Sequence, residues 1–424
     1  MESINVAAHT LGCKVNQCDT EALLTLLGGI GCTICDFNQN ADIYIINTCT
    51  VTHAGDKKSR QMIRRAKKQN PLAKIAVCGC MVQKNPNLAQ DLGIDFVFDA
   101  RKPDGFVQEI AKLTGNIGIN YDRPNNKTRA FLKIQDGCDR FCSYCIVPYV
   151  RGKPTSRPMP EILAEAELML ANGALEIVLT GIQVASYGND IGNDTNEALP
   201  QLIKKISSFD GLRRLRLSSI DPWAVTGEFL SAVSNSKVIC DHFHLSLQSG
   251  SDTVLARMNR RYNTAQYAKA TEGLRNILPQ AAITADIIVG FPGETDAEFN
   301  DSLAFARQIG FAHIHVFEYS RREGTLAADM PNQVPEKIKS ERGRAMRELA
   351  ATLQSDFYKL QTGKTLPVLF ESKTASGTWQ GHTTNYCPVE IICDNNPANT
   401  IQPVEITGYT NAGLTGPPNP SSRA

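Results

Sequence analysis

The sequence predicts an α/β protein of 424 residues with three domains: a flavodoxin-like domain, a partial (β/α)6 barrel and a small β-barrel. Three observations predict this order. Short apolar runs alternate with helical segments over the first hundred residues, and the alternation resumes after residue 130. Beyond residue 360, short strands are broken by Gly, Asn and Pro. We place the domains at residues 1–118, 124–355 and 356–424.

Composition and charge describe an ordinary globular protein. Apolar residues make up 42% of the chain and charged residues 21%, and the net charge of +1 provides no overall attraction for nucleic acid. The first ten residues carry no secretory signal, and no apolar run reaches the roughly 20 residues that a membrane helix needs. Thirteen cysteines in such a chain favour metal or catalytic thiols over disulfides. We therefore expect a cytoplasmic enzyme without a membrane segment.

Three apolar runs in the first domain each lead to a cysteine. The runs at 4–8, 43–46 and 75–77 are followed by Cys13, Cys49 and Cys80, and glycine precedes the first and third of these cysteines. Helical segments lie between the runs, at 19–27, at 55–69 and from about 87. This alternation predicts a parallel sheet with helices on both faces, where ligands gather beyond the carboxyl ends of the strands. We therefore expect the three cysteines to converge at one edge of the sheet.

Buried structural cysteines are the alternative for this set, and Cys78 competes with Cys80 as its third member. Repeated placement at strand ends, together with a second cysteine set further along the chain, favours ligands. We prefer Cys80 because Cys78 lies within the strand, on the same pleat side as Ala76. The remaining cysteines of the domain, Cys18, Cys32 and Cys35, are expected to be core or bystander thiols. Cys32 and Cys35 also have the spacing of a redox pair.

The second cysteine set opens the second domain. Cys138, Cys142 and Cys145 follow the spacing C-x3-C-x2-C, which presents three thiolates to one face of a small inorganic cluster. A [4Fe–4S] cube has four iron atoms, so three local ligands leave one iron open to an exogenous ligand. The alternatives are a zinc knuckle and three buried thiols. Zinc prefers four ligands, usually in C-x2-C pairs, and no fourth Cys or His lies close by in the sequence.

The second domain follows a predicted linker at 122–128. Its strands are expected at 131–134, 175–179, 212–217, 242–247, 283–289 and 314–317, which fits a partial (β/α)6 barrel of the TIM type. Polar residues alternate with Leu or Phe on the third and fourth strands, so that a polar face lines a lumen suited to a cofactor. Four histidines are expected to be hydrogen-bonded lumen or packing residues rather than metal ligands: His242, His244, His313 and His315.

The cysteine spacing, with Tyr144 just before the last cysteine, resembles the signature of the radical S-adenosylmethionine (SAM) enzymes, whose core is a partial (β/α)6 barrel. In that superfamily the open iron binds SAM, and one electron splits SAM into methionine and a 5′-deoxyadenosyl radical. The resemblance implies that the SAM contacts are Tyr144 and loop residues after the strands: Gly181, Gln183, Ser218, Ser219, Gln248, Asp286 and Gly290.

The first domain resembles the amino-terminal domain of the methylthiotransferases, which join such a domain to a radical SAM core. Residues 10–17, 47–52 and 79–80 carry this resemblance. It implies that Cys13, Cys49 and Cys80 hold an auxiliary [4Fe–4S] cluster whose free iron carries the sulfur to be transferred. The segments T-L-G-C-K-V-N-Q at 10–17 and G-D-K-K-S-R-Q at 55–61 are most similar to the branch that acts on N6-threonylcarbamoyladenosine of tRNA.

Two regions bear on RNA binding. The helix after Cys49 carries seven cations against one acid, which suits either a phosphate contact or a solvated helix face. The third domain resembles the RNA-binding TRAM module through G-H-T-T-N-Y at 381–386, and its aromatic residues Trp379, His382 and Tyr386 suit either base stacking or packing. Residues 417–424 are expected to form a disordered tail.

The resemblance implies a tRNA methylthiotransferase that uses SAM and two [4Fe–4S] clusters to convert N6-threonylcarbamoyladenosine at position 37 to its 2-methylthio form. The adenine C2–H offers no acidic proton and no leaving group, so a radical cofactor supplies what side chains cannot. The expected partners are the anticodon stem-loop of tRNA and a flavodoxin- or ferredoxin-type reductant, and we expect a monomer. The alternatives are the same chemistry on N6-isopentenyladenosine of tRNA or on an aspartate of a ribosomal protein, and a non-catalytic iron–sulfur RNA-binding sensor.

Overall fold

The computed structural model of the protein describes residues 4–85, 87, 91–114, 128–192 and 197–417. These residues form two compact units, the first from residues 1–124, 136–154 and 320–328 and the second from residues 125–135, 155–319 and 329–424. Within the described ranges, no helix combines the length and apolar character needed to cross a bilayer. The predicted linker and tail, apart from residues 128 and 417, lie outside the described residues.

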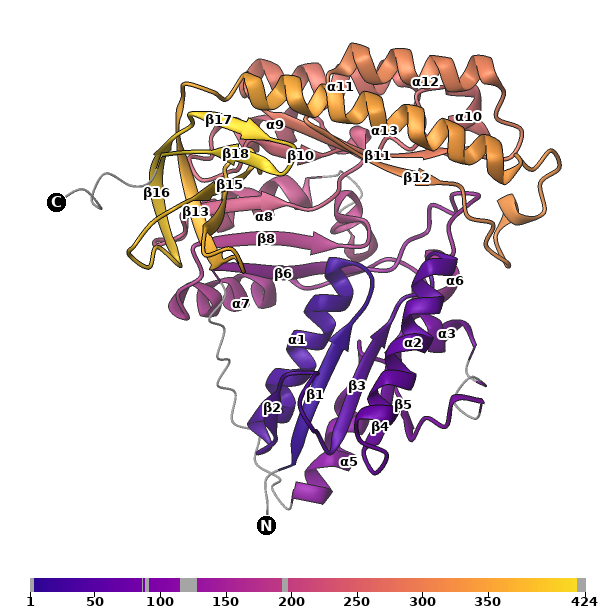
Figure 1. Cartoon of the computed structure of the whole chain (residues 1–424), viewed down its shortest axis with the longest axis vertical. Coiled ribbons are helices and arrows are strands. Elements are labelled where there is room, and N and C mark those ends of the chain that lie inside the picture. Colours follow the sequence, from indigo (N-terminus) through magenta and orange to yellow (C-terminus); the bar gives the residue numbers. More distant parts are fainter. Residues whose placement is uncertain (1–3, 86, 88–90, 115–127, 193–196, 418–424) are drawn as a thin grey trace. The chain divides into compact units, whose positions relative to one another are not determined.

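A five-stranded parallel sheet forms the centre of the first unit (Figure 1). Its order is β2-β1-β3-β4-β5, the flavodoxin-like order in which ligands bind where β1 and β3 diverge. The strands are β1 (Asn5–Thr10), β2 (Thr33–Cys35), β3 (Ile43–Thr48), β4 (Lys74–Gly79) and β5 (Phe96–Val97). The helices are α1 (Lys14–Gly29), α2 (His53–Gln69), α3 (Cys80–Lys84), α5 (Asp104–Thr114) and α6 (Val147–Arg151).

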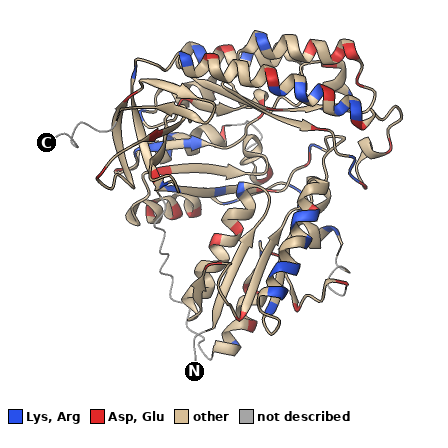
Figure 2. Ribbon diagram, in the orientation of Figure 1, with Lys and Arg blue, Asp and Glu red and all other residues tan. Residues whose placement is uncertain are grey.

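Apolar clusters cover both faces of this sheet, as predicted. Leu23 and Ile110 belong to the cluster on one face, and Ile63 belongs to the cluster on the other. Helix α2 begins after Thr52, whose hydroxyl accepts a hydrogen bond from Gly55 N. Its buried residues fall at the helical spacing i, i+4, i+7, so only one stripe of the helix faces the sheet: Ser59, Ile63 and Ala66. Figure 2 shows Lys and Arg along the outside of α2.

The second unit contains the predicted partial barrel. Its six parallel strands are β6 (Arg129–Asp136), β8 (Glu176–Gly181), β9 (Arg214–Leu217), β10 (His242–His244), β11 (Ala282–Val289) and β12 (His313–Glu318), and the short β7 (Thr155–Ser156) lies beside β6. Parallel bridges from Leu215 to Ile239 and from Ile220 to Leu245 connect the sheets of β9 and β10. The fourth strand is shorter than predicted because its regular ladder ends at His244 and the chain turns at Gln248, where φ is +74°.

Helices cover the apolar side of these strands (Figure 1). They are α7 (Met159–Ala171), α8 (Ala198–Ser207), α9 (Gly227–Ser234), α10 (Asp252–Arg257), α11 (Thr264–Ile277), α12 (Asp296–Ile309) and α13 (Glu336–Lys359). Capping boxes at Asn263 and Thr295 start α11 and α12. The sequence predicts one long helix at 335–361, and the structure forms it as α13. The domain border predicted at 355 falls within this helix and stays a prediction.

A six-stranded sheet follows α13. Its order is β16-β13-β14-β15-β18-β17, and it encloses an apolar cluster that includes Phe370, Val389 and Ile391. The strands are β13 (Thr365–Lys373), β14 (Trp379–Thr383), β15 (Pro388–Ile391), β16 (Thr400–Glu405), β17 (Gly408–Thr410) and β18 (Gly413–Thr415). The sequence predicted the first four. The last two are three residues each and contain glycine, so they carry too little strand pattern to predict.

Candidate active site

Cys13, Cys49 and Cys80 lie directly beyond the carboxyl ends of β1, β3 and β4, three neighbouring strands of the first sheet. Cys13 caps the amino end of α1, and Cys80 is the first residue of α3. The strand ends are joined by a hydrogen bond of 2.9 Å from Leu11 N to Asn47 O. This arrangement results from the parallel topology, because every strand points its carboxyl end toward the same edge.

The thiols of this set are close enough to affect one another. The pKa of Cys80 is raised to about 11, chiefly by burial and also by the thiols of Cys13 and Cys49, while the Arg151 guanidinium acts to lower it. Burial likewise raises the pKa of Cys49, with a further contribution from Cys13. This mutual influence places the three thiols near one another.

Glycines leave room beside Cys49. A Cβ atom on Gly12 would lie 3.3 Å from Cys49 Sγ, and one on Gly55 would lie 3.4 Å from the same sulfur. Gly79, which precedes Cys80, has a φ of +89°, and a Cβ there would lie 2.3 Å from Asn47 Oδ1. The backbone turns before Cys13 and Cys80 therefore require glycine, and the lack of side chains at Gly12 and Gly55 keeps these two positions from crowding the Cys49 sulfur.

Cys78 and Cys80 have different surroundings. Cys78 is 1% exposed, belongs to the apolar core below the sheet, and has a pKa raised by burial. Cys80 lines a small cavity together with Asp19 and Arg151. The polar cavity supports Cys80 as the ligand, because a structural thiol needs only apolar contacts. Cys18 and Cys32 are buried, and Cys35 Sγ lies 3.7 Å from Val6 O, as expected for bystander thiols.

Cys138, Cys142 and Cys145 lie in the loop that ends at α6, within the same compact unit as the first set. Hydrogen bonds from Cys138 N to Gly152 O (3.0 Å) and from Cys145 N to Cys142 O (2.9 Å) shape this loop. The amide of Arg140 donates to Cys138 Sγ at 3.5 Å. A Cβ on Gly137 would lie 2.0 Å from Lys153 O, so the two ends of the loop meet closely.

The two sets of cysteines are connected by packing. Cys80, Ile146 and Val150 form a small buried cluster, and Ile146 directly follows Cys145. A third segment, residues 320–328, contacts both sets: Ala327 N donates to Ser143 O at 2.7 Å, and the buried Arg322 donates to Thr50 Oγ1 and pairs with Asp56. Segments far apart in sequence therefore meet beside the loops that carry the two cysteine sets.

Arg151 is a second buried arginine of this region, with 7% of its surface exposed. Its Nη1 donates to both carboxylate oxygens of Asp136 at 2.8 Å, and its Nη2 donates to Asn16 Oδ1 and lies 3.5 Å from Asp19 Oδ2. Sequence analysis matched no specific role to Arg151. Its charge favours thiolates nearby, which metal binding requires.

The cysteine geometry tests the zinc alternative. Two sulfurs bound to one zinc ion at about 2.3 Å each lie at most about 4.6 Å apart. Among the described residues, the one group of three or more His, Cys, Asp or Glu side chains whose ligand atoms all lie within 4.8 Å of one another is His244, Asp286 and His315. Neither cysteine set is therefore spaced for a single ion, whereas a multi-iron cluster needs more widely separated thiolates. The residues fit the cluster.

The predicted SAM contacts of the second unit lie beyond the carboxyl ends of its strands. Gly181 is the last residue of β8 and Gln183 follows it, Gln248 follows β10, and Gly290 follows β11 with a φ of +71°. Ser218 follows β9, and its buried hydroxyl oxygen has no hydrogen-bond partner among the described residues, so it suits a ligand hydroxyl. The Ser219 side chain is exposed, so the structure supports a SAM contact at Ser219 less than at Ser218. Tyr144 is half-buried in the cysteine loop of the first unit.

Sequence analysis missed the centre of a polar network beside these loops. The buried Asp221 accepts hydrogen bonds from Gln183 Nε2, from Arg260 Nη2 and from Trp223 Nε1 (3.2 Å). Two features of the sequence could have indicated this network: the Asp-Pro-Trp segment at 221–223, after the third predicted strand, and the arginine pair at 260–261, after the fourth. Asp286 lies on β11, and its Oδ2 is 3.5 Å from His244 Nε2.

Three of the four histidines of the lumen are hydrogen-bonded, as predicted, and the fourth, His315, lies with His244 and Asp286 in a group whose ligand atoms are all within 4.8 Å of one another. His242 Nε2 and His244 Nδ1 both contact Thr284 Oγ1, at 3.2 and 3.0 Å, and His313 Nδ1 contacts Gln354 Nε2 at 2.9 Å. Burial lowers the pKa of His313 to about 4, with help from His315 and His244. The imidazole of His313 is therefore neutral near pH 7.

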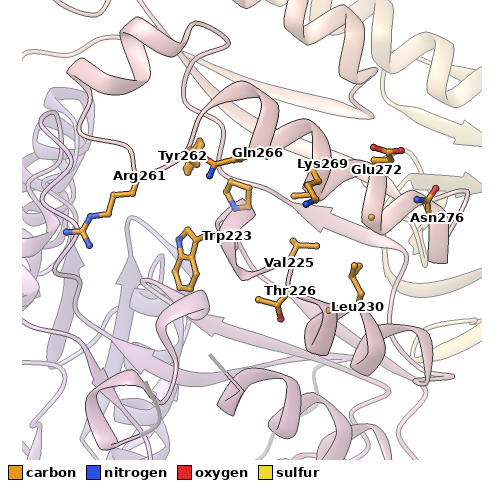
Figure 3. A pocket seen from close by; sticks show the side chains of 14 residues that line it. Trp223, Val225, Thr226, Leu230, Arg261, Tyr262, Gln266, Lys269, Glu272 and Asn276 are labelled. Atoms are coloured by element: carbon orange, nitrogen blue, oxygen red, sulfur yellow. The ribbon is translucent and has the colours of Figure 1, made fainter. Parts of the chain in front are cut away.

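A cavity of about 640 Å³ lies on the helical side of the second unit. Figure 3 shows its side chains, which come from residues 222–226, α9, the loop before α11 and α11 itself, and include Trp223, Arg261 and Lys269. None of the residues predicted to bind SAM lines it. Trp223 lines the cavity and also donates to Asp221, so the cavity borders the polar network without containing its carboxylate.

Comparisons with known proteins agree with this geometry. Residues 132–306 match the radical SAM superfamily, and residues 5–99 match the uncharacterized protein family UPF0004. Among solved structures, the radical SAM methyltransferase TsrM from Kitasatospora setae shares the fold with a TM-score of 0.58 at 14% identity, covering 77% of each chain. Fold and cysteine motif together define a radical SAM enzyme.

Relatives that match over most of their length indicate the family more specifically. The threonylcarbamoyladenosine tRNA methylthiotransferase MtaB of Bacillus subtilis is 39% identical over 91% of this chain and 89% of its own, and that of Thermotoga maritima is 34% identical over 96% of both. The tRNA-2-methylthio-N(6)-dimethylallyladenosine synthase of Pelotomaculum thermopropionicum is 33% identical over 96% of this chain and 95% of its own. The chain belongs to the radical SAM methylthiotransferase family, whose cofactors are SAM and two iron–sulfur clusters.

Proposed function

We propose that the protein converts N6-threonylcarbamoyladenosine at position 37 of tRNA to 2-methylthio-N6-threonylcarbamoyladenosine. The observation that carries the proposal is the placement of two three-cysteine sets in one compact unit, with Cys80 packed against the residue that follows Cys145. A radical source and a sulfur source must both reach one adenine carbon, so such a reaction needs its two clusters close together. Several relatives that match most of the chain carry this substrate in their names, which supports the choice of nucleoside.

The roles of the residues follow from their surroundings. Cys138, Cys142 and Cys145 hold the cluster that binds SAM, and Cys13, Cys49 and Cys80 hold the auxiliary cluster. When bound, these groups supply the electron that cleaves SAM and the sulfur that is transferred. Ser218 donates or accepts a hydrogen bond at a SAM hydroxyl, and Gln183, oriented by Asp221, binds the methionine end. The remaining proposed SAM contacts are Tyr144, Gly181, Ser219, Gln248, Asp286 and Gly290.

Arg151 and Arg322 assist the auxiliary set. Both guanidiniums are buried, and both lower the pKa of a neighbouring cysteine, Arg151 that of Cys80 and Arg322 that of Cys49. Burial acts in the opposite direction and is the larger influence on both thiols. The two arginines therefore offset part of the unfavourable free energy of holding thiolates in a buried site. We propose further that a flavodoxin or ferredoxin supplies electrons and that the protein acts as a cytoplasmic monomer.

A second candidate substrate is N6-isopentenyladenosine of tRNA. It is favoured by relatives named for dimethylallyladenosine, which are 33–34% identical over 96% of this chain. The B. subtilis relative named for threonylcarbamoyladenosine is more similar, at 39%. We therefore keep threonylcarbamoyladenosine as the substrate and let the experiment decide between the two.

The test uses protein reconstituted anaerobically with iron and sulfide, then supplied with SAM, a reductant and tRNA carrying one of the two modified adenosines. Mass spectrometry of the digested nucleosides is expected to show the 2-methylthio product from the threonylcarbamoyl substrate. Product from the isopentenyl substrate alone would select the second candidate. SAM cleavage without product on either tRNA would contradict both.

Matched cysteine variants separate the two clusters. A variant with Cys13, Cys49 and Cys80 all changed to Ala should still cleave SAM but make no methylthio product. Changing Cys138, Cys142 and Cys145 to Ala should abolish both activities. A protein that binds tRNA and two clusters yet never cleaves SAM would be the RNA-binding sensor instead.

A further inference from the structure

Helix α2 carries an uncompensated positive surface next to the auxiliary cysteines. It begins at His53, four residues after Cys49, and Ser59 Oγ accepts a hydrogen bond from Cys49 N at 3.2 Å. Its buried stripe faces the sheet, and the remaining positions carry the cations visible as a blue band in Figure 2. We call these seven side chains the α2 cations: Lys57, Lys58, Arg60, Arg64, Arg65, Lys67 and Lys68.

No acid within the helix balances this charge. Asp56 is the single acidic residue of α2, and it already pairs with the buried Arg322. Within the part of the chain that the structure describes, none of the α2 cations belongs to an ion pair of 4.0 Å or less. The whole chain has 44 basic and 43 acidic residues, so this concentration is local.

A helix face that only contacts water would be built differently. Solvated helices alternate charges, as α13 does with Glu336, Glu341 and Glu348 among its cations. In α2, Arg60, Arg64 and Lys68 repeat at spacing i, i+4, where like charges repel. Lys67 and Lys68 lie in the last turn, where the helix dipole favours cations, so the unfavourable term is the repulsion among Arg60, Arg64 and Lys68. This repulsion opposes helix stability, and an anionic partner would relieve it.

We propose that α2 binds the sugar–phosphate backbone of the substrate tRNA next to the adenosine that is modified. This inference rests on the proposed function and deepens it. From Lys57 to Lys68 the helix extends about 17 Å, enough to follow several consecutive phosphates. Because the helix starts beside Cys49, a strand lying along it would pass the auxiliary site. Backbone contacts of this kind give affinity and position rather than sequence preference.

The aromatic residues of the last sheet are not available for the same task. Tyr386 packs against Arg129, Arg216, His242 and His382 within the second unit, and Trp379 is 9% exposed in an apolar core. The sequence left base stacking and packing open for these aromatic residues. In the structure, Tyr386 and Trp379 are packed against other side chains. These two rings therefore add no argument for base stacking, and the case for an RNA contact in the described residues rests on charge.

The experiment measures binding of a fluorescent anticodon stem-loop RNA containing N6-threonylcarbamoyladenosine across 50–300 mM KCl. In the variant K57Q/K58Q/R64Q/K68Q, all four changed side chains are exposed, and the structure gives them no ion pair or hydrogen bond. The Kd at 100 mM KCl should rise at least tenfold. The slope of log affinity against log salt should become shallower by about 0.7 for each phosphate that the variant no longer neutralises.

The matched control is K204Q/K205Q/K337Q/K359Q, which removes the same charge from exposed positions on α8 and α13. It should leave both Kd and slope nearly unchanged. Equal losses in the two variants, or no loss in the α2 variant, would overturn the proposal. Single variants K57Q and R64Q, each expected to lower the slope by about 0.7, keep the test decisive if the quadruple variant misfolds.

Two further outcomes are informative. An α2 variant that binds RNA normally but cleaves SAM more slowly with a flavodoxin would assign the surface to an acidic reductant, and the tRNA proposal would be wrong. If the wild type and the α2 variant modify the tRNA equally well, only the inference about α2 is overturned. Wild-type protein that makes no methylthio product would instead contradict the proposed function.

Discussion

The guanidinium of Arg216 lies 4.6 Å from the centre of the Tyr386 ring. Arg216 is on β9 of the barrel and Tyr386 is in the turn between β14 and β15, so the contact joins two elements of the second unit that are 170 residues apart in sequence. Arg129 lies over the same ring at 5.0 Å, and His382 stacks on it at 4.8 Å. Tyr386 has a φ of +67°, a strained conformation that these contacts hold in place.

Replacing Tyr386 by Ala should loosen the last sheet from the barrel. The loss of two cation–π contacts and of the packed ring should destabilise the contact by about 2–4 kcal/mol. Hydrogen–deuterium exchange of the β14 and β15 amides measures this as faster opening. Tyr386→Phe is the control, since it loses only the 3.3 Å hydrogen bond from Arg129 and should cost less than about 1 kcal/mol. Unchanged exchange with weaker RNA binding would identify Tyr386 as a stacking residue instead.

Cys80→Ala should lower the iron content of the protein, and Cys78→Ala should leave it unchanged. Loss of Cys80 removes a ligand from the auxiliary site, so iron should fall from about eight to about four atoms per chain. Loss of Cys78 leaves a small void in the core and all six ligands, so iron should stay near eight. Iron assay and electron paramagnetic resonance on reconstituted protein check both. The ligand assignment fails if Cys78→Ala loses the iron and Cys80→Ala keeps it.

Glu176 should make stability depend on pH in the acid range. Burial alone would raise the pKa of this carboxyl, but Arg216, Arg129 and Arg214 outweigh burial and hold the pKa at about 2. Since this pKa lies below the unfolded value of about 4.5, the stabilisation is complete above about pH 5 and is lost as pH falls toward 2. The loss should amount to about 3 kcal/mol.

Denaturant unfolding of the wild type and of Glu176→Gln between pH 2 and 7 tests this. The variant should be less stable at pH 7, because three guanidiniums lose their buried carboxylate, and its stability should change less below pH 5. Glu165→Gln, which removes a partly exposed partner of Arg157, controls for the loss of one carboxylate. Parallel pH curves for wild type and Glu176→Gln would contradict the prediction.

Ser218 and Ser219 should differ in SAM binding. The Ser218 hydroxyl is buried without a partner among the described residues, so a ligand hydrogen bond there should contribute about 1 kcal/mol. Ser218→Ala should therefore raise the Kd for SAM about fivefold, as measured by equilibrium dialysis with reconstituted protein. Ser219→Ala changes an exposed side chain and should leave the Kd unchanged. A larger effect at Ser219 would reverse the assignment of the ribose contact.

Much of this protein was determined by local sequence pattern. The spacing of Cys138, Cys142 and Cys145 is enough to predict them as one ligand set, because a single short loop holds all three. The convergence of Cys13, Cys49 and Cys80 also followed from sequence, because parallel strands bring their carboxyl ends to one edge whatever their separation along the chain. The regular strands and α13 were predictable for the same reason, since their periodicity is local.

Only the tertiary structure decided which distant groups surround those sites. Arg151 meets Asn16 and Asp19, Arg322 meets Thr50, and Tyr386 meets Arg216, and no pattern in the sequence relates the members of these pairs. Their contacts depend on how separately predictable elements pack, and a buried charge or ring acquires its partner only in that packing. The cysteines thus identify the chemistry, and the fold selects the arginines that support it.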